Sequence, residues 1–170
     1  MSSAGGTGSV RAAPLAAVRV IGIGRPERGD DALGRCVAQR LAAEAPAGVW
    51  VTECAGEFAT LLDLWEGARA AIVVDALQSG AAPGTLLRLD GLTEPLPTPV
   101  ECSTHGFGLA EAIEIGRALH RLPPVLIVYG AEGACFAAGG GLSPRVAAVV
   151  PDLADAVRRE ACALAGAHAA

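Results

Sequence analysis

Apolar residues occur along the chain in two patterns: short uninterrupted runs, and longer stretches in which apolar positions recur at helical spacing. The uninterrupted runs are typical of strands that are buried on both faces of a sheet. We expect strands at 18–23, 49–53, 70–74, 85–89 and 125–129. We expect helices at 31–45, 56–65 and about 104–120, and a last helix that begins after Ser143 and kinks at Pro151. This alternation predicts an α/β fold, a three-layer sandwich with a mostly parallel sheet between helices.

One domain is expected for a chain of 170 residues. Apolar residues make up 52% of the chain and charged residues only 18%, a balance that excludes a disordered protein. The first residues are small and lack the apolar centre of a signal peptide. We therefore expect 1–14 to be a flexible leader and 15–167 to be the domain. No apolar run reaches the roughly 18 residues that a membrane span needs.

Charge and cysteine content exclude several classes of partner. The formal net charge is −5, and the 13 basic residues are all arginines that form no basic patch, so nucleic acid is a poor partner. The five cysteines are odd in number and scattered, without a C-x-x-C pair. That distribution disfavours a disulfide framework or a cysteine-rich zinc site and fits a reducing compartment. We expect a cytoplasmic protein that binds no membrane.

The chain is organised around residues 18–35, VRVIGIGRPERGDDALGR, which read as a buried strand, a loop and the start of a helix. The G-x-G in this stretch does not begin a dinucleotide fingerprint, because Glu27 stands where the third glycine belongs. Two acids at the helix start would also repel a pyrophosphate. For Asp30 we favour a role as the helix N-cap. Asp31 is a candidate for chemistry, with a favourable dipole interaction as the structural alternative.

Three polar residues are expected to meet at one edge of the sheet. Asp31 follows the first strand, Asp75 ends the third, and His105 opens the helix after the proline-rich segment 91–100. In an open α/β sheet such positions face the edge where ligands bind. Two carboxylates and an imidazole suit a divalent metal ion and leave coordination positions open. The structural alternatives are a turn cap for Asp75 and a hydrogen bond to a carbonyl for His105.

Four segments resemble the successive signature blocks of the [NiFe]-hydrogenase maturation endopeptidases, in the order and at the intervals of that family. They span about residues 18–165 and read GIGRPERGDDALG, IVVDALQSGAAPGT, STHGFGLAEAI and LSPRVAAVVPDLADAV. The resemblance implies a single α/β domain with a twisted five-stranded sheet between helices. It implies an enzyme that removes a C-terminal extension from the precursor of a hydrogenase large subunit after nickel insertion.

The resemblance also assigns residues. Asp31, Asp75 and His105 match the positions that contact nickel in the family, so they are the expected catalytic and metal-binding residues of an aspartic-type or metal-assisted endopeptidase. The nickel would be supplied by the substrate, and the large-subunit precursor would be the partner; the oligomeric state is left open. Two positions depart from the family. Ala55-Gly56-Glu57 replaces its GGT block, and Arg25 replaces an asparagine, which places a positive charge near the expected site.

The residues are also compatible with two other functions. Cys102, His105 and Asp75 could form a Cys-His-Asp hydrolase, although no feature of the sequence lowers the pKa of that thiol. The second alternative is a nickel-binding protein without catalytic activity. The presence of Arg25 in place of the family's asparagine leaves this alternative open. Glu57 and Glu132 are expected to be solvated loop acids. The leucines near Trp65 are expected in the core; they are Leu61, Leu62 and Leu64.

Overall fold

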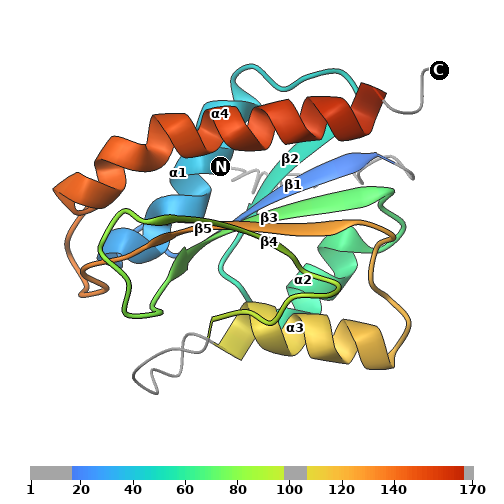
Figure 1. The fold of residues 1–170 in the computed structure, drawn as a ribbon, viewed down its shortest axis with the longest axis horizontal. Helices are drawn as coiled ribbons and strands as arrows, with labels where there is room; N and C mark the ends of the chain where they lie inside the picture. The colour runs from blue at the N-terminus through green and yellow to red at the C-terminus, as the bar shows by residue number, and fades with distance from the viewer. Residues whose placement is uncertain (1–16, 98–106, 167–170) are drawn as a thin grey trace, which may run out of the picture.

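The computed structural model describes residues 17–97 and 107–166 (Figure 1). Its strands are β1 (Val18–Ile23), β2 (Val49–Cys54), β3 (Ala70–Leu77), β4 (Leu86–Asp90) and β5 (Leu126–Glu132). Its helices are the 3-10 turn η1 (Gly29–Ala32), α1 (Leu33–Ala42), α2 (Phe58–Trp65), α3 (Phe107–Ala118) and α4 (Pro144–Gly166). These elements form the α/β sandwich that the sequence predicts.

The five strands form one sheet in the order β2-β1-β3-β5-β4. Strands β2, β1, β3 and β5 run parallel, and β4 pairs antiparallel with β5 at the edge. Every residue of β1 and β5 is buried, as is typical of parallel strands covered on both faces. From β1 the chain crosses to β2 on one side, and it then returns past β1 to β3 on the other. The strand order therefore reverses between β1 and β3, and α/β proteins typically bind ligands at the carboxyl ends of the strands at such a reversal.

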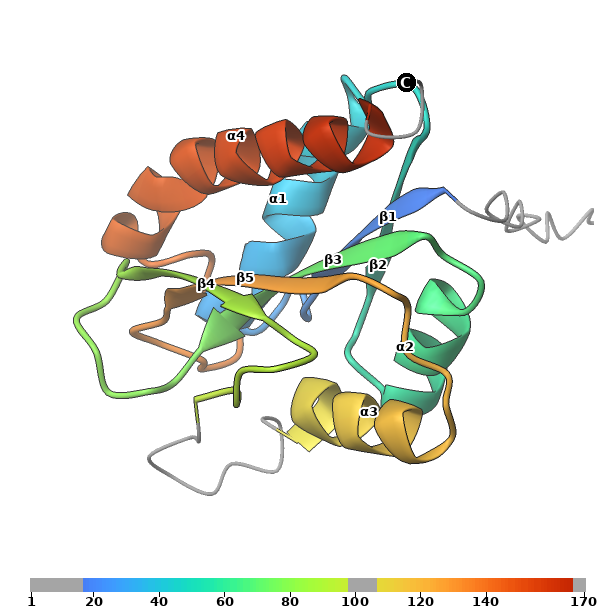
Figure 2. The same cartoon turned by 45° about the vertical axis from the view of Figure 1, so that its right-hand side comes forward.

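Two helices cover each face of the sheet. Helices α1 and α4 lie on one face and α2 and α3 on the other, as Figures 1 and 2 show. The first layer packs through Leu33, Val37, Leu41, Leu153 and Val157, and the second through Leu61, Leu62, Trp65, Ala112 and Ile113. The prediction that the leucines of α2 belong to the core is confirmed, with Leu64 partly buried against the cluster.

Several elements begin or end at other residues than expected. Strands β3 and β5 are longer than predicted, ending at Leu77 and Glu132, because their last residues pair with each other in register. Helix α4 runs from Pro144 to Gly166 as one helix with Pro151 inside it. The predicted start of α3 at about residue 104 lies outside the described residues, as does the predicted leader at 1–14.

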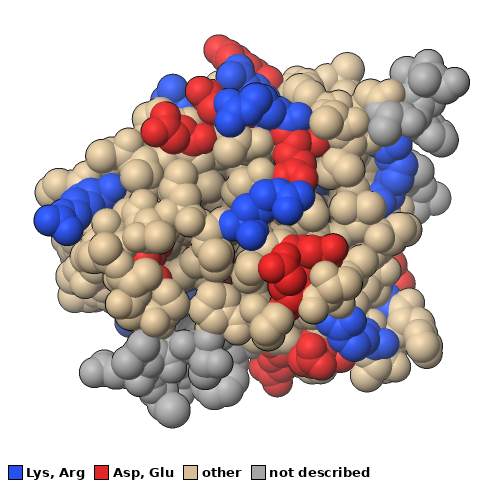
Figure 3. All heavy atoms as spheres, in the orientation of Figure 1, with Lys and Arg blue, Asp and Glu red and all other residues tan. Residues whose placement is uncertain are grey.

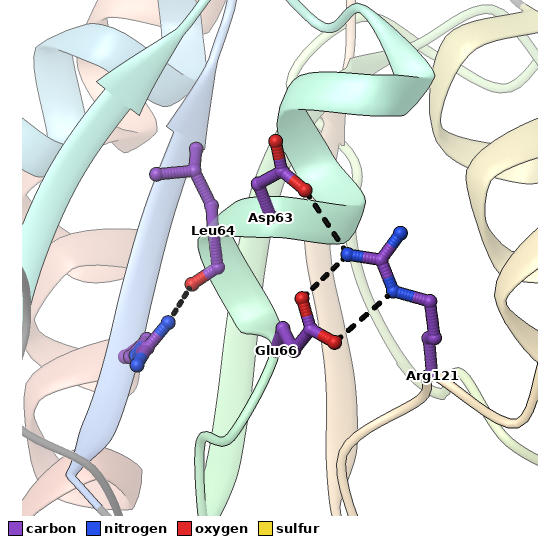
Figure 4. A network of polar contacts seen from close by, with 5 residues as sticks. Asp63, Leu64, Glu66 and Arg121 are labelled. Atoms are coloured by element: carbon purple, nitrogen blue, oxygen red, sulfur yellow. Dashed lines mark hydrogen bonds and ion pairs between the residues drawn. The ribbon is translucent and has the colours of Figure 1, made fainter.

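Charged side chains also tie neighbouring elements together. Arg121, which follows α3, binds Asp63 at 3.0 Å and Glu66 at 2.5 Å, and so joins the ends of the two helices on that face (Figure 4). On the other face Arg88 of β4 and Tyr129 of β5 both bind Glu160 of α4. Acidic and basic side chains are interspersed on the face seen in Figure 3. None of the helices in the described part of the chain is long and apolar enough to span a membrane.

Candidate functional site

Asp31 lies on η1, directly beyond the carboxyl end of β1. Its Oδ2 atom accepts a hydrogen bond of 2.9 Å from the backbone N–H of Arg25, and its side chain is partly buried. The turn is tight because Gly24 adopts φ +144°, and a Cβ atom at Gly24 would lie 1.7 Å from the carbonyl oxygen of Asp31. The chain therefore folds back on itself and holds Asp31 above the sheet edge.

Asp75 lies within β3, two residues before its end, opposite Gly130 of β5. The expectation that the strand ends at Asp75 was wrong; its carboxylate accepts a hydrogen bond of 2.8 Å from the Ala76 N–H and caps no described turn. Burial raises the pKa of Asp75 to about 7; the Ala76 N–H lowers it, and the charge of Asp31 raises it further. The two carboxylates thus lie at the same edge and interact electrostatically.

His105 and Cys102 lie outside the described residues. The helix that follows them does reach the same edge. A Cβ atom at Gly108, in the first turn of α3, would lie 2.1 Å from the Gly56 carbonyl oxygen, and one at Gly56 would lie 2.9 Å from the Ile23 side chain. The start of α3 therefore lies close to the end of β1. Within residues 17–97 and 107–166 no three His, Cys, Asp or Glu residues are grouped to hold a metal ion.

Asp30 is fully buried and does not cap the helix, contrary to expectation. Arg28 holds the N-cap position of η1 without a side-chain hydrogen bond. The Asp30 carboxylate instead accepts hydrogen bonds from Ala134 N–H at 2.7 Å, Cys135 N–H at 2.9 Å, and the N–H and hydroxyl of Ser143 at 2.6 and 2.9 Å. Burial by itself would raise the pKa of Asp30, but these four hydrogen bonds outweigh it and lower the pKa.

Glu132 was expected to be a solvated loop acid, and that expectation was wrong. It is the last residue of β5, only 4% exposed, and it accepts hydrogen bonds from Ser79 N–H, Ser79 hydroxyl and Gly80 N–H at 2.8–3.0 Å. It therefore fastens the turn that follows β3. The sequence gives little signal for this role, because the predicted strand 125–129 stops three residues short of Glu132. Glu57 is exposed, as expected.

A thiol lies at the third strand end of this edge. Cys54 ends β2 and is buried. Burial raises the pKa of its thiol to about 11; a hydrogen bond from Gly56 opposes the rise and the charge of Asp75 adds to it. A thiol with this pKa is protonated at neutral pH and is a poor nucleophile. The sequence alone does not single out Cys54, because its proximity to Asp75 depends on the order of the strands in the sheet.

The edge therefore offers two interacting carboxylates. Asp75 is poised to take or give a proton near neutral pH. A divalent cation placed between Asp31 and Asp75 would relieve their repulsion and favour the charged form of both. One further ligand from a neighbouring segment would complete a three-ligand set that leaves positions open for a substrate.

Comparison with known proteins shows the family and the fold. The model of the HycI family, hydrogenase maturation protease, matches residues 39–160. The hydrogenase maturating endopeptidase HybD from E. coli is similar in structure, with a TM-score of 0.70 and 25% identity over 83% of this chain and 89% of that one. A second endopeptidase structure from Escherichia coli has a TM-score of 0.74 and 24% identity over the same shares.

An archaeal structure has the same fold. The [NiFe] hydrogenase maturation protease HycI from Thermococcus kodakarensis KOD1 has a TM-score of 0.63 and 23% identity over 85% of this chain and 91% of that one. A comparison with curated proteins gives no match.

Proposed function

The chain belongs to the hydrogenase maturation protease family, and from that membership we propose that it cleaves a C-terminal extension from a [NiFe]-hydrogenase large-subunit precursor once nickel is in place. The nickel ion is part of the substrate in this proposal. Asp31, Asp75 and His105 would complete its coordination, so that docking and recognition of the loaded state become one event. The metal-assisted step and the identity of the precursor are the parts of the proposal that experiment has to test.

The observation that carries the proposal is the interaction between the two carboxylates. Asp75 has a pKa of about 7 because it is buried and lies near the charge of Asp31. Such a pair is unfavourable in its fully charged form and becomes favourable when a cation lies between its members. A precursor without nickel lacks that cation, so its approach would not relieve the repulsion. This difference gives the site a physical means of selecting the loaded precursor.

Hydrolysis adds water across the scissile peptide bond. The hydroxyl group goes to the carbonyl carbon, the C–N bond breaks, and a proton goes to the leaving amine. A divalent ion polarises a carbonyl group and lowers the pKa of bound water. The carboxylate of Asp75, held in its charged form by the cation, would take the proton from the attacking water and return it to the leaving amine. Asp31, fixed by the Arg25 N–H, would serve as the second carboxylate ligand.

The direct test is cleavage of purified precursor, with and without nickel, followed by mass spectrometry. The wild-type protein should shorten only the nickel-loaded precursor. Asp31→Asn, Asp75→Asn and His105→Ala should each lower kcat by about 100-fold or more, because each removes a ligand or a base. Asp152→Asn, which alters an exposed acid on α4, is the matched control and should keep wild-type activity. Equal activity of all variants would contradict the proposal.

The same samples separate the alternatives. Tight binding of Ni²⁺ by the protein alone, without shortening of the precursor, would favour a nickel-binding module. Cys102→Ser should keep full activity; its inactivity, with retained activity of Asp31→Asn, would favour a thiol hydrolase.

A further inference from the structure

Asp30 and Asp31 are adjacent in the chain but have opposite surroundings. The Asp30 side chain is fully buried and all four of its hydrogen-bond donors come from residues 134–143. The Asp31 side chain is partly exposed at the sheet edge. With both oxygens of Asp30 in use, Asp31 is the member of the pair that is free to face a substrate.

The hydrogen bonds of Asp30 join the two ends of the segment between β5 and α4. Ala134 and Cys135 lie at the start of the segment between β5 and α4, and Ser143 lies at its end. Glycines 139–141 between them have no atom within 4 Å of a Cβ built at their positions, so a side chain would find open space there. Their backbone is held by hydrogen bonds, such as that from the Gly139 N–H to the Glu27 carbonyl at 2.9 Å. The carboxylate of Asp30 binds both ends of this segment and so holds them together.

Backbone hydrogen bonds dock the same segment on η1. Asp30 N–H donates to the Cys135 carbonyl at 2.8 Å, and Gly29 N–H donates to the Gly140 carbonyl at 3.1 Å. A Cβ atom at Gly29 would lie 2.4 Å from the Cys135 carbonyl oxygen, so the two backbones are in direct contact. The turn that carries Asp31 is thus held by β1 on one side and by the clamped segment on the other.

We propose that Asp30 is a positioning residue, which fixes the place of the Asp31 carboxylate at the sheet edge by clamping the segment 133–143 onto η1. This inference rests on the proposed function, since Asp31 is taken as a substrate ligand. A shift of about 1 Å in a reacting group lowers rates by about 100-fold, and groups that orient metal ligands typically change activity 10- to 100-fold. Loss of this clamp should therefore lower kcat.

The test compares three variants in the precursor cleavage assay, each well below its melting temperature. Asp30→Asn keeps the size of the side chain but turns an amide NH₂ toward backbone N–H groups, and should lower kcat at least tenfold with KM within twofold of wild type. Ser143→Ala removes the hydroxyl donor alone and should lower kcat two- to fivefold. Glu160→Gln, on α4, loosens a tie to Arg88 and Tyr129 rather than to Asp30 or the segment 133–143, and should keep wild-type kcat.

Each outcome decides the inference. Wild-type kcat in folded Asp30→Asn would overturn it, and so would an equal fall of kcat in Asp30→Asn and Glu160→Gln at equal loss of stability. If Asp30→Asn does not fold, an unchanged kcat in Ser143→Ala overturns the inference and the expected fall supports it. If the wild-type protein cleaves no loaded precursor, the proposed function fails first and the inference falls with it.

Discussion

Gly34 of α1 lies directly against the carbonyl group of Val74 in β3. A Cβ atom at position 34 would lie 2.1 Å from that oxygen and 2.4 Å from the carbonyl oxygen of Ile23. Val74 precedes Asp75, and Gly34 follows Asp31 by three residues. This contact therefore sets the separation between the two elements that carry the candidate carboxylates.

The first prediction follows from that contact. Gly34→Ala should destabilise the protein by about 3 kcal/mol or more, because the added methyl group meets backbone carbonyls that cannot move away like a flexible side chain. Chemical denaturation followed by circular dichroism measures the loss. Gly141→Ala is the matched control, since no atom lies within 4 Å of a Cβ there, and it should change stability by less than about 0.5 kcal/mol. Equal stability of both variants would show that α1 shifts freely on the sheet.

The second prediction concerns pH. The pKa of Asp75 is about 7 in the folded protein and about 3.9 in an unfolded chain. The folded state therefore binds the extra proton between these values, and stability falls as pH rises through that window. The loss from this group is complete above the folded pKa and absent below the unfolded one. At about 1.4 kcal/mol per pH unit, it amounts to roughly 3 kcal/mol between pH 5 and pH 8.

Asp75→Asn should remove this dependence. Urea denaturation of the metal-free protein at pH 5 and pH 8 should show the variant gaining stability relative to wild type as pH rises. Asp152→Asn, an exposed acid, should follow the wild-type curve. Parallel curves for wild type and Asp75→Asn would mean that Asp75 titrates as an ordinary carboxyl group.

The third prediction concerns the end of α3. His120 adopts φ 55°, the left-handed conformation that favours glycine. Arg121 N–H donates to the Gly116 carbonyl and His120 N–H to the Arg117 carbonyl, which is the hydrogen-bond pattern of a Schellman C-cap. His120→Gly should stabilise the protein by about 0.5–1 kcal/mol. Thermal unfolding measures the gain, and His120→Ala, which keeps a Cβ atom, should show none.

The fourth prediction concerns Arg25, which replaces the asparagine expected from the family resemblance. Arg25→Asn leaves the backbone N–H that binds Asp31 in place and replaces the guanidinium group with a neutral amide. If the guanidinium group binds a carboxylate of the precursor, KM should rise about tenfold with little change in kcat, and the difference should shrink at high salt. Arg40→Asn, on the exposed side of α1, should keep the wild-type KM. A higher kcat in Arg25→Asn would instead show that the charge repels the nickel ion.

The fifth prediction concerns thiol reactivity. Cys135 and Cys162 are exposed, whereas Cys54 is buried and its pKa is raised to about 11. Iodoacetamide at pH 8 should modify the first two and leave Cys54 unmodified in the folded protein, because the thiolate is the reactive form. Peptide mass spectrometry reads out the sites, and unfolding in urea should expose all three. Early modification of Cys54 would indicate that the end of β2 opens readily.

The sequence predicts the order and type of the elements well, because apolar runs and helical spacing are local properties. It predicts Asp31 and Asp75 at one edge because parallel strands end at the same side of a sheet. The roles of Asp30 and Glu132 could not be read in this way. Each binds backbone groups more than 50 residues away, a distance along the chain that local pattern does not encode. His105 stays a prediction, since it lies outside the described residues.

The clamp at Glu132 has a consequence for the turn that follows β3. Glu132 binds Ser79 and Gly80, so the position of this turn is set by β5 as well as by the strand that precedes it. Because β3 and β5 are neighbours in the sheet, the chain just beyond Asp75 is anchored on two sides.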